Sequence, residues 1–349
     1  MNLETLGWTP SMDATFQPWR EKGLVPGRVA VEDKHYYAVL TSQGEVTGQV
    51  AGKLLHKAQS AAELPKVGDW AALTYVSNEA KAVIHDILPR RTKLSRKVPG
   101  RELEEQVLAA NLDKAFAVQA LDRTFNPALL QRHLVMVLES GASPVLVLNK
   151  ADLCEDLPPK IAQAERVAGD APVVVVSAKT CAGLDHLRAL IQPGETIVFM
   201  GSSGVGKSTL INDLCGEEVQ ATAEVRARDA KGRHTTSWRE LILLPNGGLV
   251  IDTPGMREFQ MWMADAGIRE AFDDLDALAL HCHFRDCTHT AEKNCALLEA
   301  LAAGQISPER YQSYLKLRKE LVYLAQAQTK HAWLQRKRQS RAAQRSLNK

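Results

Sequence analysis

The strongest constraint on the fold is a glycine-rich octapeptide near the middle of the chain, Gly201-Ser-Ser-Gly-Val-Gly-Lys-Ser208. The apolar run before it, Thr196–Met200, predicts a buried strand, and the spacing of Thr209–Cys215 after it predicts a helix. A G-x-x-x-x-G-K-S sequence between a strand and a helix is typical of a loop that binds nucleotide phosphates. Lys207 would neutralise the β- and γ-phosphates, and the Ser208 hydroxyl would bind Mg²⁺. The residues predicted to bind the nucleotide here are Gly201, Ser202, Ser203, Gly204, Val205, Gly206, Lys207, Ser208 and Thr209.

The segment before this loop alternates between strands and helices. Buried strands are predicted at Lys114–Ala120, Val145–Leu148 and Val173–Val176, and Asn126-Pro127 opens a helix that ends near Ser140. Such alternation predicts a parallel sheet with its ligand loops at the carboxyl ends of the strands.

Two of those strands run into short polar motifs that suit a guanine base. Asn149-Lys-Ala-Asp152 follows one strand, and Ser177-Ala-Lys179 follows the next. The Asp152 carboxylate can accept hydrogen bonds from guanine N1–H and N2–H₂, which adenine cannot donate, so discrimination of guanine from adenine of order 10⁴ or more is expected. N-K-x-D alone is a weak signal because Asn and Asp are common turn residues, but its combination with the other motifs is specific. The predicted base-binding residues are Asn149, Lys150, Ala151, Asp152, Ser177, Ala178 and Lys179.

Two motifs after the phosphate loop are expected to contact Mg²⁺ and the γ-phosphate. In the polar loop Lys231–Thr236, Thr235 is expected to complete the Mg²⁺ coordination, with Thr236 as the alternative. Asp252, after another buried strand, would bind Mg²⁺ through water, and the Gly255 N–H would contact the γ-phosphate.

The residue that would orient the attacking water is less well defined. Met256 follows D-T-P-G and cannot orient water, so intrinsic hydrolysis should be slow unless another group places the water. His234 is a candidate for that catalytic role, and an ordinary solvated loop histidine is the alternative. Arg233 and Arg257 lie near enough in sequence to be considered as arginine fingers, but neither is assigned.

The order of these motifs is unusual, because the base-reading motifs precede the phosphate loop. This order predicts a circularly permuted GTPase domain, which is tolerated when the original termini lie close together. It also places the segment after D-T-P-G next to the following domain, which suggests that the nucleotide state is relayed there.

The N-terminal part has the pattern of a small β-barrel. Five short β-type runs lie between Gly27 and Leu88, and they predict a five-stranded barrel of the OB type, a fold that often binds nucleic acid. Residues 89–101 form a basic, proline-bounded linker without an acidic residue, which is either solvated or in contact with RNA phosphates. Helical character is predicted from Glu102 to Ala110.

The C-terminal part carries a compact set of metal ligands. Three cysteines and one histidine lie within fourteen residues and predict a closed, structural Zn²⁺ site with the ligands Cys282, Cys287, His289 and Cys295. The cysteines outside this set are expected to be plain core residues: Cys154, Cys181 and Cys215.

A last helix starts at Ser307-Pro308 and presents an apolar stripe that includes Tyr314 and Leu324. From Lys330 onward the chain has seven Lys and Arg residues and no acidic one. This tail is expected to be disordered when free and to order on RNA.

The composition indicates where in the cell the protein is expected, but it does not identify a binding partner. At 45% hydrophobic and 24% charged residues, the 349-residue chain has the composition of a soluble globular protein. It lacks an apolar run long enough to span a membrane and a recognisable signal peptide, so we expect a cytoplasmic protein without membrane contact. The net charge of +2 predicts no particular partner.

Together these motifs resemble the RsgA/YjeQ family, the small-subunit-dependent GTPases of bacterial ribosomes, over nearly the whole chain. The resemblance implies a multidomain protein with an OB-type barrel and basic linker (residues 1–100), a permuted α/β P-loop GTPase domain (101–262) and a mainly α zinc-binding domain with a basic tail (263–349). It implies a monomeric late assembly checkpoint factor that binds the 30S subunit and its 16S rRNA, hydrolyses GTP to GDP and phosphate, and is stimulated by that subunit. It also favours a catalytic role for His234. The alternative is a nucleotide-regulated rRNA-binding module with little hydrolysis of its own.

Overall fold

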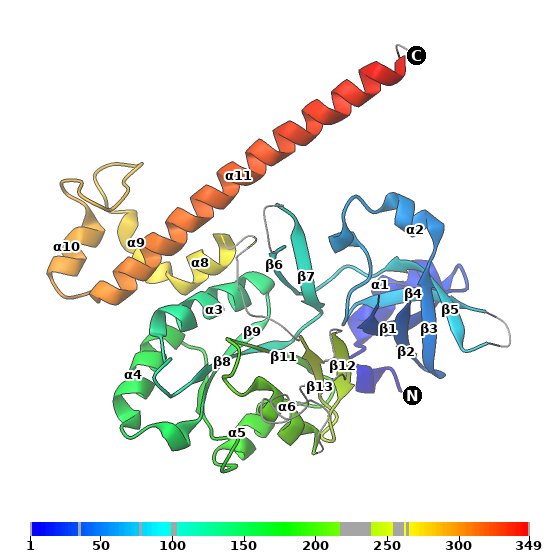
Figure 1. The fold of residues 1–349 in the computed structure, drawn as a ribbon, viewed down its shortest axis with the longest axis horizontal. Coiled ribbons are helices and arrows are strands. Elements are labelled where there is room, and N and C mark those ends of the chain that lie inside the picture. Colours follow the sequence, from blue (N-terminus) through cyan, green and yellow to red (C-terminus); the bar gives the residue numbers. More distant parts are fainter. Residues whose placement is uncertain are drawn as a thin grey trace, which may run out of the picture.

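The computed structural model of the chain describes residues 2–33, 36–76, 79–98, 103–216, 239–253, 262 and 265–347, with side chains up to residue 329. The N-terminal barrel, the central domain and the C-terminal helices lie next to one another, and the last helix extends away from the body (Figure 1).

A closed five-stranded barrel forms the N-terminal domain. Its strands β1 and β2 pair as antiparallel neighbours, β3 pairs with β5 in parallel, and β4 closes the barrel by pairing with both β5 and β1. Helix α2 (Gly52–Lys57) lies between β3 and β4 in the sequence. This connectivity confirms the predicted OB-type barrel. The strand bounds are β1 Val25–Glu32, β2 Tyr37–Thr41, β3 Gly44–Val50, β4 Trp70–Tyr75 and β5 Lys81–Ile87.

The first residues of the chain, which carry no sequence motif, pack on this barrel. A short 3₁₀ turn (Glu4–Leu6) precedes helix α1 (Pro10–Arg20). The Trp8 ring meets the rings of Phe16 and Trp70 edge-on, at centroid distances of 5.7 and 4.7 Å. Aromatic contacts therefore fix this segment to β4.

The central domain is built on a sheet with the strand order β10-β9-β8-β11-β13-β12, in which only β12 is antiparallel to its neighbour. Apolar side chains on one face pack against α3 and α4, and those on the other face pack against α5 and α6. The strands are β8 Lys114–Ala120, β9 Ser143–Asn149, β10 Val173–Val175, β11 Thr196–Met200, β12 Glu240–Leu243 and β13 Leu249–Asp252. The helices are α3 Pro127–Ser140, α4 Leu157–Ala168, α5 Leu184–Ala189 and α6 Lys207–Cys215, with a 3₁₀ turn at Ala151–Leu153.

A hairpin joins the barrel to the central domain. Strand β6 (Lys93–Lys97) pairs with β7 (Glu105–Ala110), so the helix predicted at Glu102–Ala110 is wrong. Pairing across the hairpin and burial of Val107–Ala110 outweigh the local helix preference of this run. A second link is the pairing of Val31 in β1 with Glu240 in β12, which merges the two sheets into one.

The C-terminal part is helical, as predicted. Helices α8 (Asp265–Ala271), α9 (Asp273–Ala279) and α10 (Ala296–Ala302) are short, whereas α11 runs for 40 residues from Pro308 to Leu347. At 1.5 Å per residue α11 is about 60 Å long. The prediction of a disordered tail is therefore wrong up to Leu347, because the backbone continues the helix that Pro308 opens.

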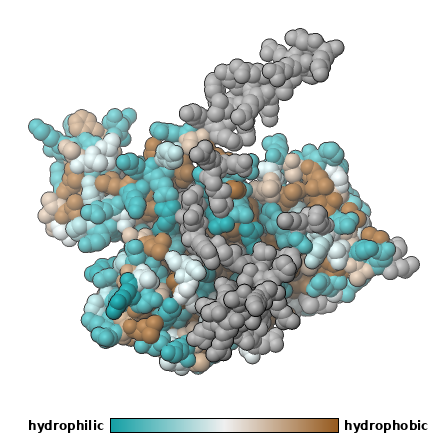
Figure 2. Space-filling model, viewed as in Figure 1, coloured by the Kyte–Doolittle hydropathy of each residue, from teal (hydrophilic) through white to brown (hydrophobic). Residues whose placement is uncertain are grey.

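On the face drawn in Figure 2, hydrophobic residues are interspersed with hydrophilic ones. Among the described residues, no helix has both the length and the apolar character that crossing a bilayer requires.

Candidate nucleotide site and metal centre

The glycine-rich loop follows β11 and leads into α6. Gly201, Gly204 and Gly206 have φ angles of 149°, 81° and 101°, and residues other than glycine rarely adopt such positive values. A Cβ atom at Gly201 would lie 2.3 Å from the Val118 carbonyl oxygen. Backbone conformation and close packing therefore both require glycine here.

The Lys207 ammonium lies across this loop. Its Nζ donates hydrogen bonds to the carbonyl oxygens of Gly201, at 2.8 Å, and Ser202, at 2.9 Å. Ser208 and Thr209 follow in the first turn of α6, whose N-terminus faces the loop. The loop thus combines a cation with a helix N-terminus, an arrangement that attracts phosphate.

Asn149, at the end of β9, connects three of the predicted motifs. Its Nδ2 donates to the Val205 carbonyl at 2.9 Å, and its Oδ1 accepts from the Ala178 N–H at 3.1 Å. The structure therefore brings the phosphate loop, the N-K-A-D motif and the S-A-K motif together at one edge of the sheet.

The carboxylate of Asp152 is also oriented. The Ser177 hydroxyl donates to Asp152 Oδ1 at 2.6 Å, and Ser177 Oγ in turn accepts from the Thr180 N–H at 3.2 Å. The Ala151 N–H donates to the Val176 carbonyl, which fixes the loop to the end of β10. Lys179 is exposed beside this loop. Such a fixed carboxylate can select donors on a purine edge.

Of the residues after the phosphate loop that are predicted to contact Mg²⁺ or the γ-phosphate, Asp252 is among the described residues. Asp252 ends β13, the strand next to β11, so it lies at the same edge as the phosphate loop. The other residues predicted there lie outside the described residues: His234, Thr235, Thr236, Gly255 and Met256.

The four predicted metal ligands do come together. The donor atoms of Cys282, Cys287, His289 and Cys295 all lie within 4.8 Å of one another. His289 Nδ1 is 3.5 Å from the sulfur atoms of Cys282 and Cys295, so Nδ1 is the nitrogen that faces the cluster. Burial, followed by the charge of Arg318, lowers the pKa of His289, which favours the neutral imidazole that binds metal. The donor set fits a tetrahedral metal ion of the zinc type.

Of the other three cysteines, Cys154 and Cys215 are half-buried and pack against the apolar clusters of the central domain. Cys181 is exposed, so the prediction of a core residue is wrong for this cysteine. Cys181 lies in the loop after S-A-K with a φ of 59°, where it cannot serve as a core residue.

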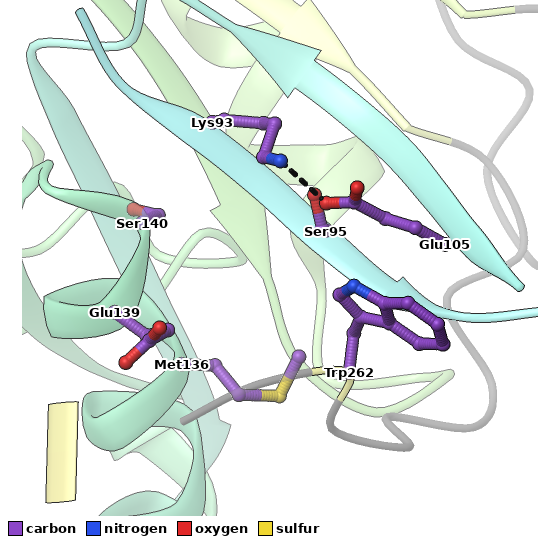
Figure 3. Close-up of a pocket in the computed structure, with 7 residues that line it drawn as sticks. All are labelled: Lys93, Ser95, Glu105, Met136, Glu139, Ser140 and Trp262. Atoms are coloured by element: carbon purple, nitrogen blue, oxygen red, sulfur yellow. Dashed lines mark ion pairs between the residues drawn. The ribbon is translucent and has the colours of Figure 1, made fainter. Parts of the chain in front are cut away.

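A small cavity lies away from these residues, between the β6–β7 hairpin and α3 (Figure 3). Its volume of about 80 Å³ is too small for a nucleotide, and none of the predicted site residues lines it. It is lined by Lys93, Ser95, Glu105, Met136, Glu139, Ser140 and Trp262.

The sequence analysis missed Asp122, the second residue after the end of β8. Its carboxylate lies 3.4 Å from Lys150 Nζ, at the edge where the predicted motifs meet. A polar residue after a predicted parallel strand was the available signal, since ligand loops lie at the carboxyl ends of such strands.

Comparison with known proteins agrees with this arrangement. Residues 87–262 match the family model for the RsgA GTPase. The chain is 44% identical to "Small ribosomal subunit biogenesis GTPase RsgA" of Opitutus terrae, over 93% of this chain and 91% of that protein. It is 43% identical to "Small ribosomal subunit biogenesis GTPase RsgA 2" of Lactiplantibacillus plantarum, over 96% and 94%.

Solved structures show the same fold. YjeQ from Thermotoga maritima superposes with a TM-score of 0.65 at 26% identity, covering 86% of this chain and 99% of that one. YloQ, described as a circularly permuted GTPase, superposes with a TM-score of 0.60 at 23% identity, covering 85% and 95%.

Proposed function

Because this chain belongs to the RsgA GTPase family, we propose that it acts late in assembly of the small ribosomal subunit as a checkpoint factor whose GTP hydrolysis is stimulated by the 30S subunit. The family itself establishes a GTPase of small-subunit biogenesis. The observation that supports the nucleotide-binding part of the proposal is the set of bonds made by Asn149, since they join the phosphate loop to the two base loops.

The residue roles in this proposal follow from the motifs. Residues 201–209 bind the phosphates, and residues 149–152 and 177–179 bind the guanine. Ser208 and Thr235 would hold Mg²⁺, Asp252 would support its binding, and the ion would supply positive charge for the phosphates. Gly255 contacts the γ-phosphate, and His234 places the attacking water.

The C-terminal cluster is proposed to hold one structural Zn²⁺. Four protein donors leave no open position for substrate, so no chemical step is assigned to this site.

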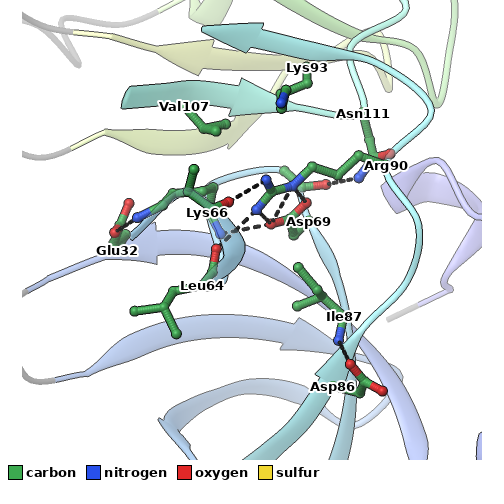
Figure 4. A network of polar contacts seen from close by, with 12 residues as sticks. Glu32, Leu64, Lys66, Asp69, Asp86, Ile87, Arg90, Lys93, Val107 and Asn111 are labelled. Carbon is green, nitrogen blue, oxygen red and sulfur yellow. Dashed lines mark hydrogen bonds and ion pairs between the residues drawn. The ribbon is translucent and has the colours of Figure 1, made fainter. Parts of the chain in front are cut away.

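The surface that contacts 16S rRNA is proposed to be α11 rather than the basic linker. In the linker, Arg90 donates to both carboxylate oxygens of Asp69 and to two carbonyl groups, as Figure 4 shows in part. Arg91 and Lys93 pair with Asp113 and Glu105. These partners inside the protein compete with RNA phosphates for the linker charges.

On α11, by contrast, Lys316, Lys319 and Tyr323 are exposed at a spacing of three and four residues, and Tyr323 is 71% exposed. The spacing places them on one face of the helix. The sequence continues with Lys330, Lys337 and Arg341 at intervals of seven, seven and four. A helix with this pattern suits the phosphate backbone of an RNA duplex.

The RNA surface is tested by charge reversal. Lys319→Glu should weaken 30S binding and make the salt dependence shallower, because one phosphate contact is lost. Arg166→Glu, which reverses one exposed charge on α4, is the matched control. Equal effects of the two variants would reject α11 as the contact surface.

The proposal as a whole is tested by GTP hydrolysis of the full-length protein with 30S subunits, with 50S subunits and alone. Strong stimulation by 30S alone is expected, and Lys207→Ala should abolish it. Tight GTP binding without stimulation by either subunit would instead support a nucleotide-regulated RNA-binding module.

The sequence also suggests a relay from the nucleotide to the C-terminal helices. In support, Gln328 on α11 donates to the Trp262 carbonyl at 3.2 Å, and Arg132 on α3 makes two 2.6 Å hydrogen bonds to Glu320 on α11. Exchange of GDP for a GTP analogue should change hydrogen exchange in α11, and unchanged exchange would reject the relay.

A further inference from the structure

Asp122 lies in the loop that follows strand β8 of the central sheet. The neighbours of β8 in this sheet are β9 on one side and β11 on the other. All three strands are parallel, so their carboxyl ends meet at one edge. The loop at Asp122 therefore lies between the base-reading loop after β9 and the phosphate loop after β11.

Thr124, in the same loop, holds the Asp122 carboxylate in place. Its Oδ1 accepts hydrogen bonds from the Thr124 N–H at 2.8 Å and from the Thr124 hydroxyl at 2.5 Å. These two bonds leave Oδ2 to accept from Lys150 Nζ at 3.4 Å. The hydroxyl bond from Thr124, together with the charge of Lys150, holds the pKa of Asp122 below its usual value, so the group is a carboxylate at neutral pH.

The backbone on both sides of this contact is fixed as well. Lys160 Nζ on α4 donates to the Leu121 and Asp122 carbonyls at 3.0 and 3.4 Å. Lys150 has a φ of 61°, and its neighbour Asn149 is bonded on both sides. The long Lys150 side chain is thus the flexible part of the contact, and the Asp122 carboxylate restricts it.

We propose that Asp122 is a positioning residue for guanine-nucleotide binding, because it holds the Lys150 side chain at the border between the base loop and the phosphate loop before the nucleotide arrives. The inference rests on the nucleotide site proposed above. A side chain that is already ordered loses less conformational entropy on binding, so the tether favours the bound state.

The test measures the dissociation rate and affinity of fluorescently labelled GDP with the full-length protein. Asp122→Asn keeps the shape but removes the charge, and we expect binding weakened by about three- to tenfold. Asp122→Glu should recover part of the loss. Asp185→Asn is the matched control, since that carboxylate pairs with Arg188 on the surface of α5 and is 96% exposed.

A double-mutant cycle separates positioning from general destabilisation. In a Lys150→Met background, Asp122→Asn should have no further effect on GDP affinity. The inference is wrong if Asp122→Asn weakens binding by the same factor in both backgrounds, or if it leaves binding unchanged in a protein that still binds GDP tightly. A wild-type protein that binds no guanine nucleotide would instead reject the proposed function.

Discussion

Gly206 shows how tightly single residues constrain the nucleotide site. Its φ of 101° suits glycine, and a Cβ atom there would lie 2.2 Å from Asn149 Nδ2. The amide of Asn149 would have to move, and its bonds to the phosphate loop and to Ala178 would be lost. Gly206→Ala should therefore weaken GDP binding by about tenfold or more, as measured by titration with labelled nucleotide.

The matched control is Gly216→Ala, at the end of α6. Gly216 also has a positive φ, of 73°, but nothing lies within 4 Å of a Cβ atom built there. Both substitutions introduce backbone strain, and only the first produces a collision. If the two variants bound GDP equally well, strain rather than the contact with Asn149 would explain the requirement for glycine.

His133 on α3 gives a prediction about acid stability. Burial, with smaller contributions from Lys207 and Arg132, lowers the pKa of His133 to about 4. In the unfolded chain the value is about 6.5, so between these two values the unfolded state binds a proton that the folded state does not. The free energy of unfolding should therefore fall as the pH drops from about 6.5 to about 4, by about 3 kcal/mol in total.

Urea denaturation at several pH values between 7 and 4 measures this loss. His133→Gln should have a flatter pH dependence in that window, whereas His56→Gln, at an exposed position on α2, should behave like the wild type. The assignment fails if the wild type and His133→Gln lose stability in parallel.

At the level of elements, the sequence predicted best those strands that are buried on both faces. Thr196–Met200 and Lys114–Ala120 match β11 and β8 residue for residue, because strands covered on both sides are nearly continuous apolar runs. Asn126 marks the start of α3, since its side chain accepts hydrogen bonds from the Ala128 and Leu129 N–H groups.

What could not be predicted depends on contacts between distant segments. Strand β7 is defined by its partner β6, and the role of Asp122 depends on the strand order, which brings its loop beside Lys150. The motif residues of the site were predictable because their chemistry is local, whereas Asp122 belongs to no motif.

The helices around the cysteine cluster should depend on the metal. Helices α9 and α10 have seven residues each, too few to be stable alone. Tyr311 on α11 donates to the carbonyl of His289, which ties the ligand loop to the long helix. Metal analysis should give one zinc per chain, and removal by a strong chelator should reduce the helical circular dichroism while GDP binding persists.

A Cys295→Ser variant should show the same loss of helicity without chelator, whereas Cys154→Ser, outside the cluster, should not. Protein purified without metal but with full helicity would contradict a structural role for the ion.

At the scale of the whole molecule, the barrel and the GTPase domain are joined by a common sheet and by a common apolar cluster. The predicted boundary near residue 100 falls inside the β6–β7 hairpin, so one strand lies on each side of it. One apolar cluster includes Phe16 and Trp70 from the N-terminal part together with Val198 and Met200 from β11. The two parts should therefore unfold together.

Arg28 is the polar centre of this junction. Its guanidinium is fully buried over the Trp70 ring and donates to the Leu6 carbonyl, to the Asn111 carbonyl at 3.2 Å and to the Thr196 hydroxyl at 2.7 Å. Burial lowers the pKa of Arg28 to about 10, which still leaves the side chain charged at neutral pH. Arg28 therefore connects the barrel to three other segments: the N-terminal segment through Leu6, the end of the hairpin through Asn111, and the start of β11, which leads into the phosphate loop, through Thr196.

Arg28→Ala would leave these acceptors without their donor inside the protein, and it should lower the free energy of unfolding by about 3 kcal/mol or more. The exposed pair of Arg20 and Asp13 offers the control, because Arg20→Ala should cost less than about 1 kcal/mol. Calorimetry should show the barrel and the GTPase domain melting in one transition. GDP should raise the melting temperature of that single transition, because a ligand that binds one part also stabilises the part that unfolds together with it. If GDP raised the melting temperature of only one of two separate transitions, the barrel would fold independently, and Arg28 would serve local packing rather than couple the barrel to the nucleotide site.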